Sequence, residues 1–293
     1  NSWLAEPWTE VSKELVAADV AKKRNWEGAY PSRVIPERVK IAFMGLDVQP
    51  DRCYFTVRGH GPREESWGIA EGELHTAGEG ASRVLDLDQA YDLAFRRGFP
   101  TQRTLDYFRN KYGKDYDELP AEIPPEDRPH VQLVRCRALA VDSGYAARLE
   151  EVRRFAQRPG VAMVKGQSAS QYGWKRQAGN PFRVSDNQAD LYLLNVDHYR
   201  ERVHRRLRLP EDHPQAFHIP MDASDDYIAH LCSMYQALET IKSGKRRGQR
   251  EIVWRLKNEG ARKDKLDCEI YALFLADFYR VINLQYDQAI AEV

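Results

Sequence analysis

The chain has 293 residues, enough to bury a substantial hydrophobic core in one large domain or in two smaller ones. It carries 44 basic and 44 acidic residues, so its formal net charge is zero and no whole-molecule field attracts a polyanion. Any contact with nucleic acid must therefore come from local patches. Four widely spaced cysteines without a C-x-x-C pair favour reduced thiols, and no apolar run nears the roughly 18 residues of a membrane span, so we expect a soluble, intracellular protein.

The first part of the chain predicts a lead-in segment followed by three antiparallel strands. Residues 1–38 are rich in Trp, Pro and charge, with a helix-like stretch at 10–24, and the prolines that follow disfavour further helix. Alternating or continuous apolar runs separated by turn residues then predict a meander. Its three strands are expected at 39–48, 53–58 and 66–70.

The remainder predicts strands that alternate with helices, which implies parallel pairing in that half of a mixed α/β sheet. Two helices are expected first, at 86–97 and 101–111. A long loop rich in Gly, Ser, Gln and aromatic residues is expected at 165–183. The other expected elements are strands at 131–141, 161–164, 191–196 and 251–256, and helices at 145–157, 197–207 (with Asp197 as a possible N-cap), 224–241 and 265–284.

Three aspartates occupy related positions in these expected elements. Asp47 and Asp142 each end an apolar, strand-like run, and Asp267 opens an apolar helix, so the three carboxylates could converge at one end of the sheet. Hard cations of the Mg²⁺ kind bind to one to three such carboxylates together with substrate phosphate. The pattern therefore suggests phosphodiester hydrolysis.

Each of these aspartates also has an ordinary structural explanation. Asp47 could begin a turn before Pro50, Asp142 could form an Asx-turn with the Ser-Gly that follows, and Asp267 could complement the dipole in the first turn of its helix. Three neighbouring acids remain lesser candidates for the same site. Asp264 is a possible auxiliary ligand or an N-cap, the direction of Glu65 is open, and Glu269 points to a different helix face from Asp267.

Six short motifs, in this order along the chain, resemble the large terminase subunit of lambda-like tailed phages. They are Asn1-Ser-Trp-Leu-Ala-Glu-Pro-Trp8, Gly45-Leu-Asp47-Val-Gln49, Glu65-Ser-Trp67, Val141-Asp142-Ser-Gly144, Val164-Lys165-Gly166 and Leu266-Asp267-Cys-Glu-Ile-Tyr-Ala272. The resemblance spans essentially the whole chain, but it covers only the C-terminal nuclease half of such a subunit. No G-x-x-x-x-G-K-[ST] sequence occurs, so the phosphate-binding loop of the packaging motor is absent.

This resemblance implies a ribonuclease H-like fold, with a mixed central sheet flanked by helices and its first three strands antiparallel. It implies a lead-in segment from the ATPase domain at 1–38 and the nuclease domain at 39–293. Asp47, Asp142 and Asp267 match the catalytic, metal-binding carboxylates of the family. They would hold two ions, Mg²⁺ or Mn²⁺, one to activate a water and the other to stabilise the leaving oxygen.

The implied activity is a metal-dependent endonuclease that cuts concatemeric double-stranded viral DNA into unit genomes in the host cytoplasm. Implied partners are the small terminase subunit, the portal or procapsid, and the ATPase domain of the same subunit, with no membrane. Two other functions stay open. One is a ribonuclease H-like nuclease of the junction resolvase type, and the other is a noncatalytic module that docks on DNA or portal.

Basic residues supply the candidate DNA contacts. The resemblance places Lys165 near the edge of the active site, and the loop after it adds Lys175 and Arg176 beside aromatic residues, which suits contact with a DNA backbone. A second candidate cluster comprises Lys245, Arg246 and Arg247. A surface lysine, core-anchoring aromatics and a solvated charged face are the competing explanations. The arginine-rich stretch at 200–208 is most simply such a solvated face.

Overall fold

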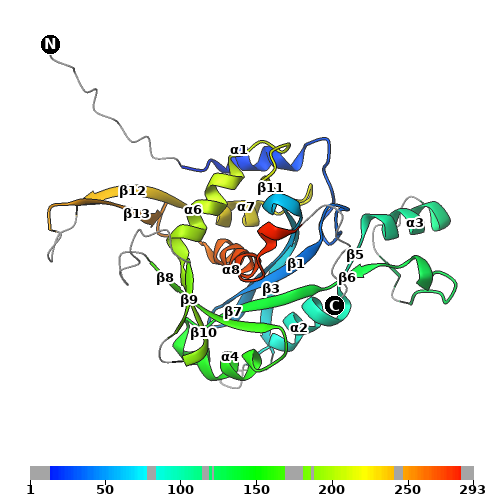
Figure 1. Cartoon of the computed structure of the whole chain (residues 1–293), viewed down its shortest axis with the longest axis horizontal. Coiled ribbons are helices and arrows are strands. Elements are labelled where there is room, and N and C mark those ends of the chain that lie inside the picture. The colour runs from blue at the N-terminus through cyan, green and yellow to red at the C-terminus, as the bar shows by residue number, and fades with distance from the viewer. Residues whose placement is uncertain are drawn as a thin grey trace, which may run out of the picture.

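The computed structural model describes residues 14–77, 84–113, 119–120, 122–168, 181–185, 188–240 and 247–284. Its centre is a sheet with the strand order β11-β3-β2-β1-β7-β8-β10-β9, and β4 pairs with β3 at the side (Figure 1). These strands span Ile41–Val48 (β1), Arg52–His60 (β2), Ser66–Ala77 (β3), Val84–Leu85 (β4), Cys136–Asp142 (β7), Val161–Gln167 (β8), Phe182–Ser185 (β9), Gln188–Asn195 (β10) and Phe217–His218 (β11).

The pairing of strands in this sheet changes from antiparallel to parallel at β1. The first three strands pair antiparallel, whereas β7 runs parallel to β1, β8 parallel to β7, and β10 parallel to β8. An antiparallel β1–β3 meander joined to parallel strands is the arrangement that the resemblance implied. The structure thus confirms the α/β, ribonuclease H-like fold with a mixed central sheet flanked by helices.

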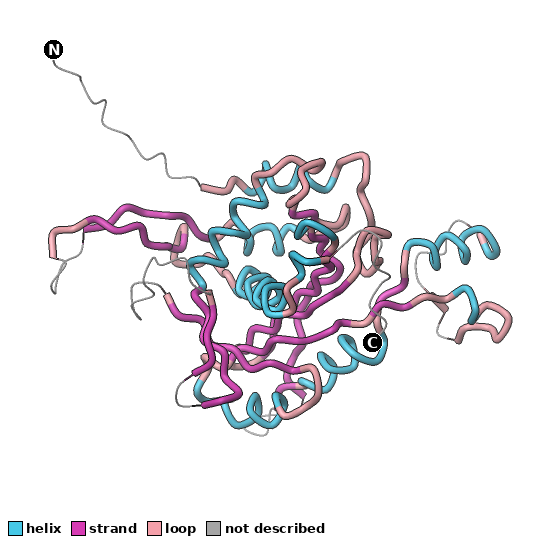
Figure 2. The backbone as a smooth tube through the Cα atoms, viewed as in Figure 1, coloured by secondary structure: helices cyan, strands magenta, loops and turns pink. Residues whose placement is uncertain are grey.

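Helices cover both faces of the sheet (Figure 2). One face packs against α6, α7 and α8, and the other against α2 and α4. The helices span Ala17–Ala21 (α1), Leu87–Tyr91 (α2), Gln102–Tyr112 (α3), Leu149–Ala156 (α4), Val196–Leu207 (α6), Asp225–Leu231 (α7) and Asp264–Phe278 (α8). Single-turn helical segments lie at Lys22–Arg24, Pro62–Glu64, Arg128–His130, Ala146–Arg148 and Val281–Asn283, and a π-helical segment at Asp92–Arg97.

Strand alternation divides the core in two. Ala42, Met44 and Leu46 of β1 belong to the cluster that includes α2 and α4, while Phe43 belongs to the cluster beneath α8. Gly45 and Asp47 share the parity of Phe43, so β1 presents a glycine and then an aspartate to the α8 side. This is the first step in building the site.

Two small two-stranded sheets lie outside the main one. The pair β5 (Phe99–Pro100) and β6 (Leu133–Val134) carries the lobe that includes α3. The pair β12 (Met234–Thr240) and β13 (Arg250–Leu256) forms a hairpin that projects from the opposite end in Figure 1. We refer to it below as the β12–β13 hairpin.

Three sequence predictions differ from the structure. The helix expected at 224–241 is wrong beyond Leu231, because residues 234–240 pair along their whole length with β13 and this tertiary pairing overrides their helix-forming composition. The helix expected at 10–24 is reduced, among described residues, to α1 and one 3-10 turn. Helix α8 ends at Phe278, since Arg280 adopts a left-handed conformation with φ of 53°.

The described part of the lead-in segment, residues 14–38, packs on the elements that follow it. The Trp26 ring stacks on His218 with centroids 4.6 Å apart, and Trp67 stacks on the same imidazole at 5.2 Å. Lys23 pairs with Glu211, whose other oxygen lies 2.7 Å from His218 Nδ1. None of the described helices is both long and apolar enough to span a membrane.

Candidate active site

The three predicted aspartates come together at one edge of the sheet. Asp47 is the penultimate residue of β1 and Asp142 is the last residue of β7, and the parallel register pairs Leu46 with Val141 immediately before them. Asp267 lies in the first turn of α8. All three are buried, with 5 to 9% of each residue exposed, and all three line one pocket of about 450 Å³.

Burial and neighbouring negative charge raise the pKa of two of these carboxyl groups, Asp47 and Asp142. Burial raises the pKa of Asp47 well above its usual range, and the nearby Asp142 and Asp267 raise it further. Burial also raises the pKa of Asp142 to about 6, although the Gly144 N–H that donates to it at 2.9 Å opposes the shift. The pocket therefore concentrates negative charge that its own hydrogen bonds only partly compensate.

Three cationic side chains line the same pocket. The Lys263 ammonium contacts Asp267 Oδ2, and the Asp267 carboxylate raises the pKa of that lysine. Arg200 of α6 places a guanidinium nitrogen 3.6 Å from Asp267 Oδ1 and another 3.0 Å from Asp197. Lys165 of β8 is the third. The site thus offers groups that attract phosphate beside groups that attract metal.

Close packing between α8 and the sheet sets the position of Asp267. A Cβ added to Gly45 would lie 1.9 Å from the Cys268 carbonyl oxygen, so only glycine allows the helix to approach β1 this closely. The Cys268 thiol donates to the Tyr54 carbonyl at 3.1 Å. Helix and strands are therefore in direct backbone contact at the level of the aspartates.

A buried ion pair fixes the rotation of the same helix. Glu269 and Arg58 pair at 1% exposure each, and the Tyr227 hydroxyl donates to Glu269 at 2.7 Å. A second Arg58 nitrogen lies 3.0 Å from that hydroxyl. Since Glu269 is held on one side of α8, Asp267, two residues earlier, is held towards the pocket.

The donor set fits a hard divalent cation. Three carboxylates from separate elements line the pocket, and Asp267 Oδ1 is buried without a hydrogen-bond partner. Within the described ranges, no three His, Cys, Asp or Glu side chains are grouped so that they could hold a metal ion as they stand. Asp267 instead turns one oxygen to Lys263, and Gln49 donates to Asp47 at 2.5 Å.

The lesser candidate acids from the sequence lie at different places relative to the pocket. Glu65 is directed elsewhere, since it bonds His218 at 2.9 Å and Arg38 at 2.6 Å. Asp264 is the first residue of α8, not its N-cap, and accepts bonds from Gln49 and Arg262. The N-cap of α6 is Asn195 and not Asp197.

The predicted DNA contacts are only partly within the described residues. Lys165 lines the pocket, and Arg247 is exposed just before β13. Lys175, Arg176, Lys245 and Arg246 lie outside the described residues. The arginine-rich helix is not the solvated face that its composition suggested, because Arg200 and Arg206 are buried and Arg202 pairs with Glu64 and Asp277.

Sequence reasoning missed several residues that line the pocket, notably Lys263, Arg200 and Tyr271. Lys263 lies four residues before Asp267, a spacing that places both on one helix face and that could have been noticed. Arg200 belongs to the arginine-rich stretch at 200–208, which was interpreted as a solvated face. Tyr271 lies one turn after Asp267, and hydrogen bonding from it lowers the pKa of Asp142.

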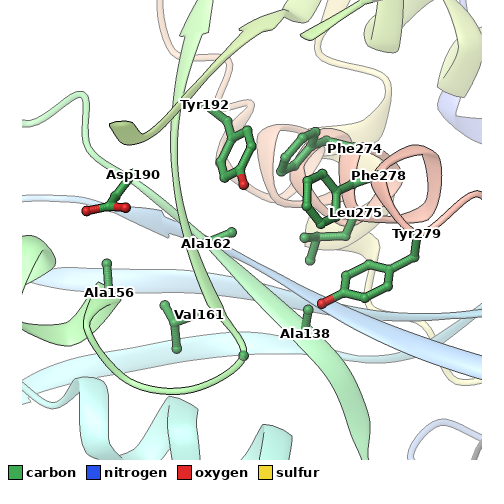
Figure 3. Close-up of a pocket in the computed structure, with 11 residues that line it drawn as sticks. Ala138, Ala156, Val161, Ala162, Asp190, Tyr192, Phe274, Leu275, Phe278 and Tyr279 are labelled. Carbon is green, nitrogen blue, oxygen red and sulfur yellow. The ribbon is translucent and has the colours of Figure 1, made fainter. Parts of the chain in front are cut away.

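A second pocket, of about 260 Å³, lies at the other end of α8 and differs in chemistry (Figure 3). Its wall is formed largely by aromatic rings, those of Tyr192, Phe274, Phe278 and Tyr279. Among the described residues that line it, Asp190 is the one carboxylate. Converging acids thus distinguish the pocket at the start of α8 from the one at its end.

Comparisons with known proteins agree with this geometry. The family model for the terminase large subunit gpA, endonuclease domain, matches residues 1–286. The large terminase subunit of Escherichia phage lambda is 25% identical over 279 residues, which cover 93% of this chain and 37% of that protein. The chain therefore spans little more than a third of the length of that relative.

Two solved structures are also similar. The large terminase of a thermophilic bacteriophage is 11% identical with a TM-score of 0.35, covering 91% of this chain and 45% of that chain. A mutant nuclease domain of the large terminase subunit gp2 of bacterial virus Sf6, with manganese, is 12% identical with a TM-score of 0.37, covering 88% and 93%. The assignment rests on the family model, which matches nearly the whole chain: the protein belongs to the gpA family of terminase large-subunit endonuclease domains.

Proposed function

We propose that this chain is a metal-dependent endonuclease that hydrolyses phosphodiester bonds of concatemeric double-stranded viral DNA, with Asp47, Asp142 and Asp267 as its metal ligands. The observation that carries the proposal is their convergence, from β1, β7 and α8, in one pocket together with three cations. Divalent metal, Mg²⁺ or Mn²⁺, would supply Lewis-acid activation of the phosphodiester and of the attacking water.

The chain's own groups have distinct tasks in this proposal. Asp47 and Asp142, at the ends of adjacent parallel strands, provide rigid oxygen ligands because both strands are hydrogen-bonded in the sheet. Asp267 provides the third and is adjustable through Lys263 and Arg200, which contact it. Lys165, Arg200 and Lys263 would orient the scissile phosphate and offset its charge.

The larger assembly is part of the proposal. The family is defined by terminase large subunits, so we propose that DNA, the small terminase subunit, the portal or procapsid and the ATPase domain of the same subunit are its partners in the host cytoplasm. A staggered cut needs one active site for each strand. At least two such nuclease domains would therefore act together.

Cleavage of supercoiled plasmid by the purified chain tests the proposal. We expect nicking with Mg²⁺ or Mn²⁺ and none with EDTA. Asp47→Asn, Asp142→Asn and Asp267→Asn should each reduce the rate more than about 100-fold, since loss of mere outer-shell partners of metal ligands commonly costs 10–100-fold. Asp212→Asn, at an exposed acid away from the pocket, is the matched control and should cleave normally.

Other results would redirect the assignment. Retained nicking in one aspartate variant would remove that residue from the ligand set. A strong preference for branched over linear duplex would favour a resolvase-type nuclease. A folded wild type that binds DNA but cleaves none with either metal would favour the noncatalytic docking module.

A further inference from the structure

The β12–β13 hairpin has two chemically different faces. In its antiparallel register, Met234, Gln236, Leu238 and Thr240 face Leu256, Trp254, Ile252 and Arg250. Because side chains alternate along a strand, these eight residues share one face, which contains no carboxylate. We call it the acid-free face. Both carboxylates of the paired segments, Glu239 and Glu251, lie on the opposite face.

The base of the acid-free face is joined to the candidate active site. The Trp254 ring packs edge-on against His204 of α6 at 4.7 Å, and the Arg200 guanidinium lies 5.5 Å from the centre of the same ring. Arg200 in turn lines the aspartate pocket and lies 3.6 Å from Asp267. The hairpin thus leaves the body directly beside the pocket, with its acid-free face turned towards α6.

Further out, the same face is exposed and apolar. Leu238 and Ile252 are opposite each other and are 48% and 44% exposed. The next pair outward is Thr240 with Arg250, and Arg250 makes no ion pair within the described ranges. A two-stranded ribbon gains little stability by itself, so two large exposed apolar side chains on one face indicate a contact surface.

We propose that the acid-free face docks on the duplex that the pocket cuts, with Leu238 and Ile252 against the sugars and bases of a groove and Arg250 on a phosphate. This inference rests on the proposed function, since it names how the substrate lies beside that site. Charge favours DNA over a protein partner: the face lacks acids, ends in a cation and continues inward to Arg200. Two-stranded ribbons fit DNA grooves, and apolar side chains can insert there.

The test measures binding of a fluorescent linear duplex by anisotropy in EDTA, in parallel with plasmid cleavage in Mg²⁺. The double variant Leu238→Ser/Ile252→Ser should bind about tenfold more weakly, with an unchanged dependence on salt. Arg250→Gln should also weaken binding and lower the salt slope by about one. Met221→Ser, which removes another exposed apolar side chain (49%) outside the hairpin, between β11 and α7, is the matched control and should bind like the wild type.

The outcomes separate this inference from the proposed function. If the wild type cleaves DNA and both hairpin variants, with unchanged melting temperatures, bind as it does, the docking inference is overturned, the nuclease stands, and the apolar pair belongs to a protein contact. If the wild type cleaves nothing but the hairpin variants still lose affinity, the proposed nuclease fails and the docking surface stands.

Discussion

Two acids on the first turns of α8 have opposite environments. Glu269 is fully paired with Arg58 and Tyr227 in the interior, whereas Asp267, two residues earlier, faces two other carboxylates and keeps one oxygen without a hydrogen bond. Buried polar groups that are satisfied fix a structure, and those left unsatisfied are expected where a ligand completes them. The comparison distinguishes Glu269, which fixes the position of α8, from Asp267, which α8 directs into the pocket.

The largest loss of stability should come from disrupting the buried ion pair between Glu269 and Arg58. Glu269→Gln leaves the buried Arg58 guanidinium without its counter-charge, which should lower the free energy of unfolding by about 3–5 kcal/mol. Urea denaturation measures this. The double variant Arg58→Met/Glu269→Met should lose less than the single variant, because no charge is then buried alone. A loss below about 1 kcal/mol in Glu269→Gln would mean that the pair does not hold the helix.

Gly45→Ala should couple stability to activity. The new methyl group would overlap the Cys268 carbonyl, so α8 must move away from β1, at a cost near the upper end of the 1–3 kcal/mol typical of overpacking. Because Asp267 moves with the helix, plasmid cleavage should fall more than the loss of folded protein explains. Gly260→Ala, where an added Cβ meets no atom closer than 3.6 Å, is the control and should change neither quantity.

The smallest expected effect is a pH dependence of the free energy of unfolding, caused by the Asp142 carboxyl group. The pKa of Asp142 is raised to about 6, so the folded protein favours the protonated form of this carboxyl group. The stability that the protonated Asp142 contributes is fully present below about pH 4 and is lost as the pH rises through 6. Asp142→Asn cannot ionise. In EDTA, its advantage over the wild type in unfolding free energy should therefore grow by roughly 2 kcal/mol between about pH 4 and pH 7. A constant difference would place Asp142 in a more polar environment.

The sequence was sufficient for the six strands β1, β2, β3, β7, β8 and β10 of the main sheet and for the convergence of the three aspartates. Apolar runs that end in Asp47 and Asp142 predicted both strands, and the order of the motifs supplied the fold. The surroundings of the aspartates could not be predicted, because they depend on contacts between distant segments. Arg200 was attributed to a charged face since nothing local marks Asp267 as its neighbour. Two residues carried usable signals: Lys263 through its four-residue spacing from Asp267, and Gly45 because an isolated glycine within a strand often marks a close approach of another backbone.

The hairpin was missed for a related reason. Residues 234–240 contain Gln, Ala, Leu and Glu in a helix-compatible order, and only pairing with β13 reveals them as a strand. The register, in turn, is what separates the acid-free face from the acidic one. A functional surface can therefore be invisible in a sequence even when its residues are conspicuous.

The imidazole of His218, stacked between Trp26 and Trp67, has a consequence for the order of folding. Lys23 and its partner Glu211 are 188 residues apart in the sequence, and Trp26 and His218 are slightly further apart. Contacts of such long range form late, after the entropy of closing the intervening chain has been lost. During synthesis Lys23 and Trp26 are made long before Glu211 and His218, so these contacts can form only after the strands β1 to β10 have been synthesised.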